Sequence, residues 1–267
     1  MTQAPTLTTR IWLEEPESGD SFSTRAAYCH GYDVYGEMLG RASWAEMLFL
    51  LVRGEAPWPE QAELLENLAV ALANAGPRDQ AVQAAMASST GGAPAAAALM
   101  AALSVGAGRH GGARDVFDAM TGWAECGTDL DAWLMRLGDM SAQRLDIWPS
   151  RERAAGFDPH GVKTPGIVLQ ALARLATGGW ARRLNWLAEH RAALEAAAGL
   201  PLAMTSIAAA AFTDLGLDPE QGEMLYLLLR LPGAAAHALE QRALGYKRFP
   251  FPAVQLEDDP AVTEAVV

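Results

Sequence analysis

Two histidines with glycine neighbours are the residues of this sequence best suited to chemistry. His110 lies in the segment Gly-Ala-Gly-Arg-His-Gly-Gly-Ala at 106–113, directly before a stretch with helical character, and His160 follows in the segment 156–164. Glycine lets a ligand approach the backbone closely, and a helix N-terminus offers N–H donors and positive potential. Imidazole can donate or accept a proton near neutral pH. These two segments are therefore the predicted location of any catalysis.

The composition limits the class of protein. The chain has 267 residues, of which 51% are hydrophobic, and alanine and leucine outnumber β-branched residues, which favours helix over sheet. The formal net charge of -12 argues against nucleic acid as a partner, because the field of the protein would repel phosphates. Arg151, Arg153 and Lys163, which flank the second histidine, are candidates for a local anion site, and a solvated rim is the alternative.

Cysteines, termini and apolar runs indicate where the protein works. Cys29 and Cys126 are too few and too isolated for a disulfide framework or a zinc site, so we expect no metal. Residues 1–10 show neither an apolar core nor a cleavage pattern, so no secretory signal is visible. No apolar run reaches the roughly 20 residues that a membrane span requires. The sequence therefore predicts a cytoplasmic protein with no membrane partner.

Hydrophobic periodicity predicts an all-α protein. Ser43 and Glu46 fit a capping box before an apolar helical face, and Pro59 lies near the first turn of the next helix, which runs to about residue 75. No convincing alternating strand is found, and residues 1–24 are predicted to form an extended arm. The remaining predicted helices span 80–88, 94–105, 112–121, 129–137, 167–176, 180–198, 201–215, 219–231 and 234–244.

Two further features concern packing and the longest connection. The alanine-rich patches at 95–98 and 208–211 are predicted to be close helix contacts, because small side chains let neighbouring helix axes approach. The stretch 141–166 is the one long connection without a helical pattern, and long loops in compact domains are often functional.

The order and spacing of several motifs resemble the citrate synthase superfamily, specifically its short members near citryl-CoA lyases. The strongest motif is His110-Gly111-Gly112-Ala113, followed by the Gly156-Phe157 loop with Lys163 and by Arg230-Leu231-Pro232-Gly233. Weaker similarities lie at 28–34, 39–51, 54–57 and 237–241, so that the resemblance covers about residues 28–248. Each motif alone is weak, and their common order carries the resemblance.

The resemblance implies a large and a small helical domain, with the active site in the cleft between them, and a homodimer. The implied division is an arm at 1–24, the first part of the large domain at 25–113, a small domain at 114–218, and the second part of the large domain with a C-terminal tail at 219–267. A CoA thioester, such as acetyl-CoA, and a small carboxylic acid would be the substrates, without a bound cofactor.

The chemistry implied is that of an acyltransferase or a C–C lyase of Claisen or aldol type, which works through the enol(ate) of a thioester. Such a reaction needs a base at the α-carbon and a hydrogen-bond donor at the thioester oxygen, where charge develops. His110 matches the histidine with which the family stabilises the enol, and Gly111 and Gly112 would adjoin the ligand. A purely structural role for His110 in a tight turn is the alternative.

The second histidine and the base depart from the family pattern. The family has Gly-Phe-Gly-His where this chain has Pro159 at the histidine position, and His160 follows one place later. His160 therefore stays open between a ligand contact and an ordinary loop residue, and Asp158 beside it is a candidate displaced carboxylate. The family's catalytic aspartate falls on Thr205, whose hydroxyl cannot accept a proton without an activating base of its own.

The side of the site that holds the acid substrate departs as well. The histidine that the family uses on the hydroxy acid falls on Ala75, and its Asp-Pro-Arg signature is replaced at 165–167. Arg248 matches the family's terminal arginine, in its own or a partner's site, unless it is a surface residue that ends a helix. The predicted catalytic residues are thus His110, His160 and Asp158, and the predicted substrate- or CoA-binding residues are Gly111, Gly112, Gly156, Phe157, Lys163, Thr205 and Arg248.

Three functions remain open at this point. The first is an enzyme of this superfamily with an altered or smaller acid partner. The second is a non-catalytic paralogue that binds a ligand, regulates or forms a scaffold, and the third is a helical interaction module unrelated to the family. Other polar and aromatic residues are interpreted as structural: Cys29 as buried, His30, His190 and His237 as capping or packing residues, and Trp133, Trp148, Trp180 and Trp186 as core or subunit contacts.

Overall fold

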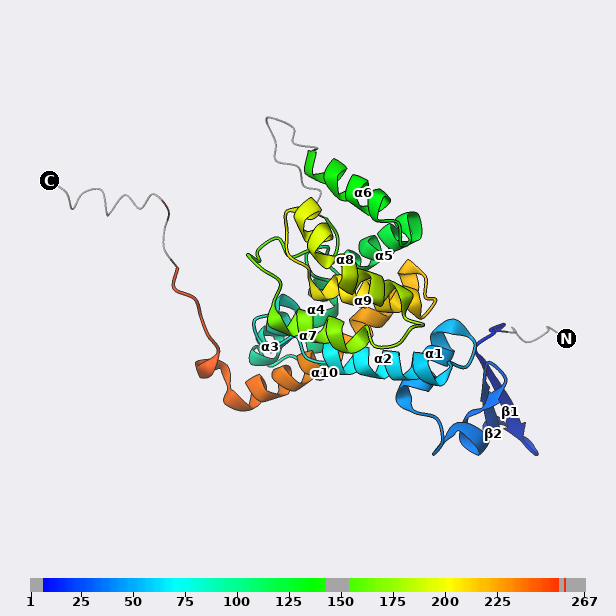
Figure 1. The fold of residues 1–267 in the computed structure, drawn as a ribbon. Coiled ribbons are helices and arrows are strands. Elements are labelled where there is room, and N and C mark those ends of the chain that lie inside the picture. Colours follow the sequence, from blue (N-terminus) through cyan, green and yellow to red (C-terminus); the bar gives the residue numbers. More distant parts are fainter. Residues whose placement is uncertain (1–6, 143–153, 255–256, 258–267) are drawn as a thin grey trace.

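The computed structural model describes residues 7–142, 154–254 and 257. Helices make up most of it, as predicted (Figure 1). The α-helices are α1 Trp44–Arg53, α2 Pro59–Leu72, α3 Gln80–Thr90, α4 Ala95–Gly106, α5 Ala113–Cys126, α6 Leu130–Ala142, α7 Gly166–Leu175, α8 Arg182–Ala198, α9 Met204–Asp214 and α10 Pro219–Leu244. A short π-helix, η1 Val34–Met38, and a 3-10 helix, η2 Tyr246–Arg248, complete the helical elements.

The prediction that the chain has no strands is wrong. Strands β1 Trp12–Glu17, β2 Asp20–Cys29 and β3 Tyr32–Asp33 form an antiparallel sheet in the order β1-β2-β3, beside α1 (Figure 1). Both faces of β1 and most of β2 are exposed, so the alternation of apolar and polar residues that marks a half-buried strand is absent from the sequence. The pairing replaces the predicted extended arm from Trp12 onward.

Local capping residues fix the helix ends where the sequence predicted them. The Ser43 hydroxyl accepts a hydrogen bond from the Glu46 N–H at 3.2 Å, and the Glu46 carboxylate accepts one from the Ser43 N–H at 2.6 Å. This reciprocal capping box starts α1 and confirms the prediction. Helix α2 begins at Pro59, where the missing N–H of proline costs no intrahelical bond.

The two helices predicted at 219–231 and 234–244 are one helix. Pro232 lies inside α10 and has no N–H to donate, and the N–H of the next residue, Gly233, donates to the Ala73 carbonyl at 2.7 Å. A Cβ at Gly233 would lie 2.5 Å from that carbonyl oxygen, so only glycine permits this approach. Packing of α10 against α3, α4 and α5 supports a helix that continues through a residue that would end an isolated helix.

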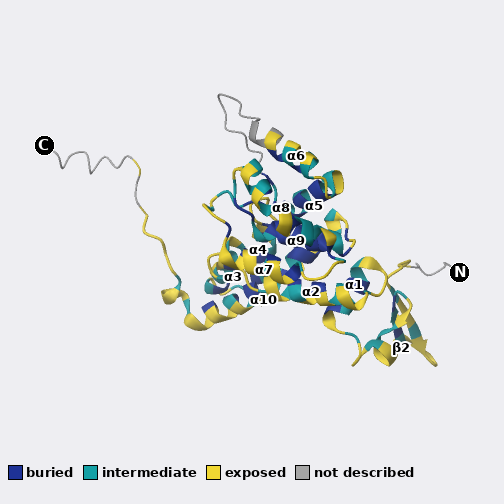
Figure 2. Cartoon of the chain, viewed as in Figure 1, coloured by how far each residue is buried: buried dark blue, intermediate teal, exposed yellow. Residues whose placement is uncertain are grey.

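The core is centred on α9. The five residues from Ala208 to Phe212 are fully buried, which confirms the alanine contact predicted at 208–211, and Figure 2 shows buried residues concentrated along α9 and α5. At 95–98 only Ala98 is buried, and Ala95 and Ala96 are exposed, so the contact predicted there is wrong for most of that patch. Helix α9 packs against α5 and α8, because a run of alanines lets helix axes come close together. The first turn of this central helix carries Thr205, one of the predicted binding residues.

The aromatic residues on α5, α6 and α8 form a packed cluster. The ring centroid of Trp123 lies 5.0 Å from that of Trp133 and 5.5 Å from that of Trp186, and both pairs have edge-to-face geometry. His190 stacks on Trp186, and its Nδ1 lies 2.9 Å from the Trp186 carbonyl oxygen. The packing roles predicted for Trp133, Trp186 and His190 are therefore confirmed, whereas Trp148 lies outside the described residues.

Other expectations concern thiols and membranes. Cys29 is fully buried, as predicted, and burial raises the pKa of its thiol. In the described part of the chain, no helix combines the length and the apolar character needed to cross a bilayer. The division into a large and a small domain stays a prediction.

Candidate functional site

His110 lies in a turn that only glycines can close. The turn joins the end of α4, at Gly106, to the start of α5, and His110 within it is exposed. Gly111 has a φ of +72°, a left-handed conformation that side chains disfavour. A Cβ on Gly112 would overlap the Gly108 carbonyl oxygen and lie 2.6 Å from that of Gly106. The turn therefore presents His110 to solvent next to the N-terminus of a helix.

Two side chains of α10, those of Tyr226 and Arg230, contact this turn. The Tyr226 hydroxyl and one guanidinium nitrogen of Arg230 each lie 3.5 Å from the Gly111 carbonyl oxygen. Arg230 also forms an ion pair with Asp79 and lies 5.0 Å from the ring centroid of Tyr226. Burial raises the pKa of Tyr226 to about 12. The charge of Arg230 lowers this pKa, and the charges of Asp115 and Asp79 raise it, each by less than burial does. Tyr226 is therefore a hydrogen-bond donor at neutral pH.

A buried carboxylate lies in the first turn of α5. Asp115 is 7% exposed, one of its oxygens accepts a hydrogen bond from the Gly156 N–H at 3.2 Å, and the other accepts one from the Thr205 hydroxyl at 2.5 Å. The N-terminus of a helix favours a negative charge at this position. Three segments distant in sequence, the start of α5, the loop at Gly156 and the start of α9, thus meet at one carboxylate.

The loop at Gly156 is fastened to the start of α9. The Gly156 carbonyl accepts hydrogen bonds from the Ser206 hydroxyl at 2.8 Å and from the Ala203 N–H at 2.9 Å. Gly156 has a φ of +88°, and a Cβ there would overlap the Ser206 hydroxyl. Phe157 is buried and pairs with Leu202 in an antiparallel bridge. Gly156 therefore belongs to the Asp115 cluster, and the binding role predicted for Phe157 stays a prediction.

Asp158, His160 and Lys163 follow in the same loop. The Asp158 carboxylate accepts a hydrogen bond from the His160 N–H at 2.9 Å, as loop aspartates commonly do, and the Asp158 N–H donates to the Pro201 carbonyl at 2.8 Å. His160 and Lys163 are exposed. The roles predicted for Asp158, His160 and Lys163 stay predictions.

A further contact holds the end of the loop. The Thr164 hydroxyl donates to Glu195 of α8 and accepts a hydrogen bond from the Leu202 N–H at 3.1 Å. Burial would raise the pKa of Glu195, but the hydrogen bonds from Thr164, Arg191 and Leu202 outweigh it and hold the pKa below its ordinary value. The end of the loop is thereby fastened to α8 and to Leu202.

Arg248 lies in η2, after the end of α10, and is exposed. Residues 249–254, which follow η2, extend away from the helical body (Figure 1). The prediction that Arg248 acts at its own or a partner's site therefore stays a prediction.

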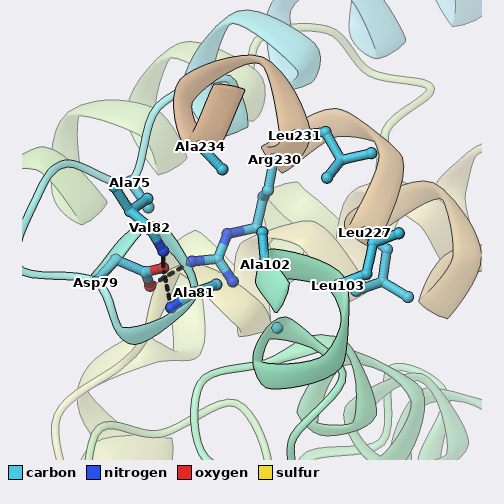
Figure 3. Close-up of a pocket in the computed structure, with 11 residues that line it drawn as sticks. Ala75, Asp79, Ala81, Val82, Ala102, Leu103, Leu227, Arg230, Leu231 and Ala234 are labelled. Atoms are coloured by element: carbon cyan, nitrogen blue, oxygen red, sulfur yellow. Dashed lines mark hydrogen bonds and ion pairs between the residues drawn. The ribbon is translucent and has the colours of Figure 1, made fainter. Parts of the chain in front are cut away.

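A small cavity lies beside the histidine turn, between α3, α4 and α10 (Figure 3). Its empty volume, open solvent included, is about 310 Å³. Ala75 lines it, and its charged groups are Arg230 and Asp79, which face each other in Figure 3. The remaining lining is alkyl or glycine: Ala81, Val82, Ala102, Leu103, Gly106, Leu227, Leu231 and Ala234. In the described part of the chain, no group of three metal-ligating side chains could hold an ion.

The structure adds three residues to the candidate site: Asp115 and Tyr226, which sequence reasoning missed, and Arg230, which lies in a motif of the resemblance but was given no role. Asp115 does carry a signal, because it falls on the helical face that also holds Ala119 and Met120, where a carboxylate must be buried and partnered. Tyr226 and Arg230 are four residues apart on α10 and so share one face. Their meeting with the histidine turn has no sequence signal.

These elements define a class of protein. Its fold is mainly helical, and a glycine-flanked histidine precedes a helix, close to a buried carboxylate. Solved structures with this fold include citryl-CoA lyase from Hydrogenobacter thermophilus, with a TM-score of 0.68 and 18% identity over 97% of this chain and 100% of that one. ATP citrate lyase from Methanothrix soehngenii, in complex with citrate and coenzyme A, has a TM-score of 0.71 and 18% identity over 97% of this chain and 43% of its own.

A citrate synthase from Thermoplasma acidophilum, in a ternary complex with carboxymethyl coenzyme A and oxaloacetate, has a TM-score of 0.57 and 15% identity over 83% of this chain and 60% of its own. No protein-family model matches the sequence, and no curated protein matches it. The chain therefore has the fold of the citrate synthase superfamily, as the sequence resemblance predicted.

Proposed function

We propose that this protein acts on a CoA thioester and forms or cleaves a C–C bond through an enol(ate), as a citrate synthase-like acyltransferase or a citryl-CoA lyase-like enzyme. The observation that carries the proposal is the exposed His110 in a glycine turn at the start of α5, in a fold shared with enzymes solved with coenzyme A or its derivatives. The protein works in the cytoplasm without a bound cofactor.

His110 stabilises the negative charge that develops on the thioester oxygen. Its exposed imidazole donates a hydrogen bond there, and the N-terminus of α5 adds positive potential. Gly111 and Gly112 carry no side chain that would keep the thioester from this turn. His160 assists from the neighbouring loop, and Lys163 and Arg248 attract the phosphates of CoA.

The acid partner is smaller or less charged than citrate. The cavity beside the histidine turn contains one cation, Arg230, among its described lining residues, and Asp79 already neutralises it. Ala75 lines the same cavity with a methyl group, which offers no hydrogen bond to a carboxylate. A further carboxylate of the substrate close to Ala75 would therefore find no hydrogen-bond donor in that side chain, which is unfavourable.

Calorimetric titration with CoA and acetyl-CoA tests the proposal. We expect micromolar binding of acetyl-CoA, and we expect His110→Ala to weaken it about tenfold or more, equivalent to about 1.4 kcal/mol. His190→Ala is the matched control, because His190 packs on Trp186 in α8 and is expected to keep the affinity. No heat with either ligand would contradict the proposal and leave a non-catalytic scaffold or regulatory paralogue as the better account.

The active form is a homodimer whose interface includes α10 and α4. Met224 and Leu228, four residues apart on one face of α10, are 57% and 42% exposed, and Met100 on the adjacent α4 is 62% exposed. Large apolar side chains on neighbouring helices favour association, because their burial removes apolar surface from water.

The double substitution Met224→Glu with Leu228→Glu is expected to yield monomers, because it would bury unpaired charges in the interface. Light scattering after gel filtration should give twice the chain mass of 28.4 kDa for the wild type and the single mass for the double variant. Met135→Glu, at an exposed methionine of α6, is the control and should stay dimeric. A wild type that elutes as a monomer would refute the homodimer.

A further inference from the structure

We propose that Asp115 replaces the base that the sequence lacks, and that it receives the substrate proton through the Thr205 hydroxyl. This inference rests on the proposed function and names the proton acceptor of the same site. Its starting point is that a threonine hydroxyl takes up a proton only when a neighbouring base accepts its own proton in turn.

The structure places that base directly against Thr205. The Thr205 hydroxyl donates to an Asp115 oxygen across 2.5 Å, a short distance typical of a hydrogen bond to a charged carboxylate. The two residues are 90 positions apart in the sequence, so the contact is a product of tertiary folding. Thr205 is 1% exposed and Asp115 is 7% exposed, so the pair is largely screened from water. Water exclusion strengthens the interactions on which a proton transfer depends.

The same segments connect this pair to the thioester side of the site. Asp115 lies in the first turn of the helix that follows His110, and Tyr226, which is influenced by the charge of Asp115, contacts the carbonyl of Gly111. The proposed step requires the α-carbon of a thioester held at His110 to reach the Thr205 hydroxyl. Sequence resemblance independently aligns Thr205 with the position of the family's catalytic aspartate.

The step balances without any further reactant. The α C–H bond of the thioester breaks, and its proton bonds to the Thr205 oxygen while the hydroxyl proton of Thr205 passes to Asp115. The electron pair of the C–H bond becomes the C=C bond of the enolate, and the carbonyl electron pair moves to the thioester oxygen, which faces His110. The reverse sequence protonates the carbon after C–C bond cleavage.

A structural role for Asp115 is the competing explanation, because its carboxylate also fastens the Gly156 loop. Ser206 offers a matched control for that role. Its hydroxyl donates to the Gly156 carbonyl at 2.8 Å, so Ser206→Ala removes an anchor of the same loop from the same turn of α9 but leaves the contact between Thr205 and Asp115 intact.

The experiment follows the exchange of the methyl protons of acetyl-CoA with deuterium oxide by NMR, on the full-length protein, together with calorimetric affinity and a thermal melt for every variant. We expect Asp115→Asn and Thr205→Val to slow the exchange about 100-fold or more, the range that general bases contribute, with the affinity for acetyl-CoA nearly unchanged. Ser206→Ala should keep most of the exchange. The double variant Asp115→Asn with Thr205→Asp moves the carboxylate to position 205 and should recover exchange.

The outcomes separate this inference from the proposed function. If the wild type exchanges protons and both Asp115→Asn and Thr205→Val keep that exchange, the inference is overturned and the proposed function stays in place. A wild type that binds acetyl-CoA but exchanges no protons also overturns the inference. A wild type that neither binds nor exchanges overturns both. If Asp115→Asn does not fold, the comparison of Thr205→Val with Ser206→Ala decides in the same way.

Discussion

Gly112→Ala is expected to lower the affinity for acetyl-CoA about tenfold or more and to slow proton exchange about 100-fold. The added Cβ would overlap the Gly108 carbonyl oxygen and lie 2.6 Å from that of Gly106, and neither backbone group can move without shifting the end of α4. Displacing His110 by about 1 Å is enough to cost about two orders of magnitude in rate, because catalysis depends on placement. Forcing an extra methyl group into a packed turn also costs about 1–3 kcal/mol of stability.

Three measurements check this prediction: calorimetric affinity, exchange rate, and the free energy of unfolding in urea. Gly166→Ala serves as the matched control, since a Cβ there meets no atom within 4 Å. Gly166 opens α7, and alanine in a helix is more favourable than glycine, so this variant should be at least as stable as the wild type. Unchanged affinity and exchange in a folded Gly112→Ala protein would show that the histidine turn does not hold the thioester.

Phe212→Ala is expected to lower the free energy of unfolding by about 3–5 kcal/mol. Phe212 is fully buried in α9, where the adjacent alanines leave little side-chain volume that could refill the space. The loss combines the transfer free energy of the ring with that of the cavity left behind. Since domains are stable by only about 5–15 kcal/mol, this single change would remove a large part of the stability.

Phe22→Ala is the control, because it is the same substitution at a side chain that is 99% exposed in β2. Urea unfolding followed by circular dichroism should give a change within about 0.5 kcal/mol for this variant. Equal losses for the two phenylalanines would mean that α9 is not the centre of the core.

The histidine turn at His110 and the buried carboxylate of Asp115 bear on whether the protein is an active enzyme or a non-catalytic paralogue. Thr205, taken alone, argues for lost activity. With Asp115 on its hydroxyl, the same position becomes one that can transfer a proton. In the cavity beside the histidine turn, Asp79 neutralises Arg230. Under the proposed function, the divergence would therefore lie on the side of the second substrate.

Much of this fold was predictable from the sequence, because its determinants are local. The capping box at Ser43, the proline at the start of α2 and the glycines around His110 act on residues within one turn of themselves, and the structure has the helix ends close to the predicted positions. The alanine run of α9 was likewise predicted as a close contact, because small side chains let helix axes approach, but the same pattern at 95–98 is mostly exposed.

Features that depend on distant partners were not predictable. The hairpin of β1 and β2 is exposed on both faces, so no apolar alternation marks it, and α10 continues through Pro232 because neighbouring helices support it. The cluster of Asp115, Gly156 and Thr205 joins residues 41 and 90 positions apart. The sequence by itself determined the helices and the histidine turn, through capping and backbone freedom. Only the tertiary structure decided where the buried carboxylate lies, because a charge inside a protein is placed by the donors that folding brings to it.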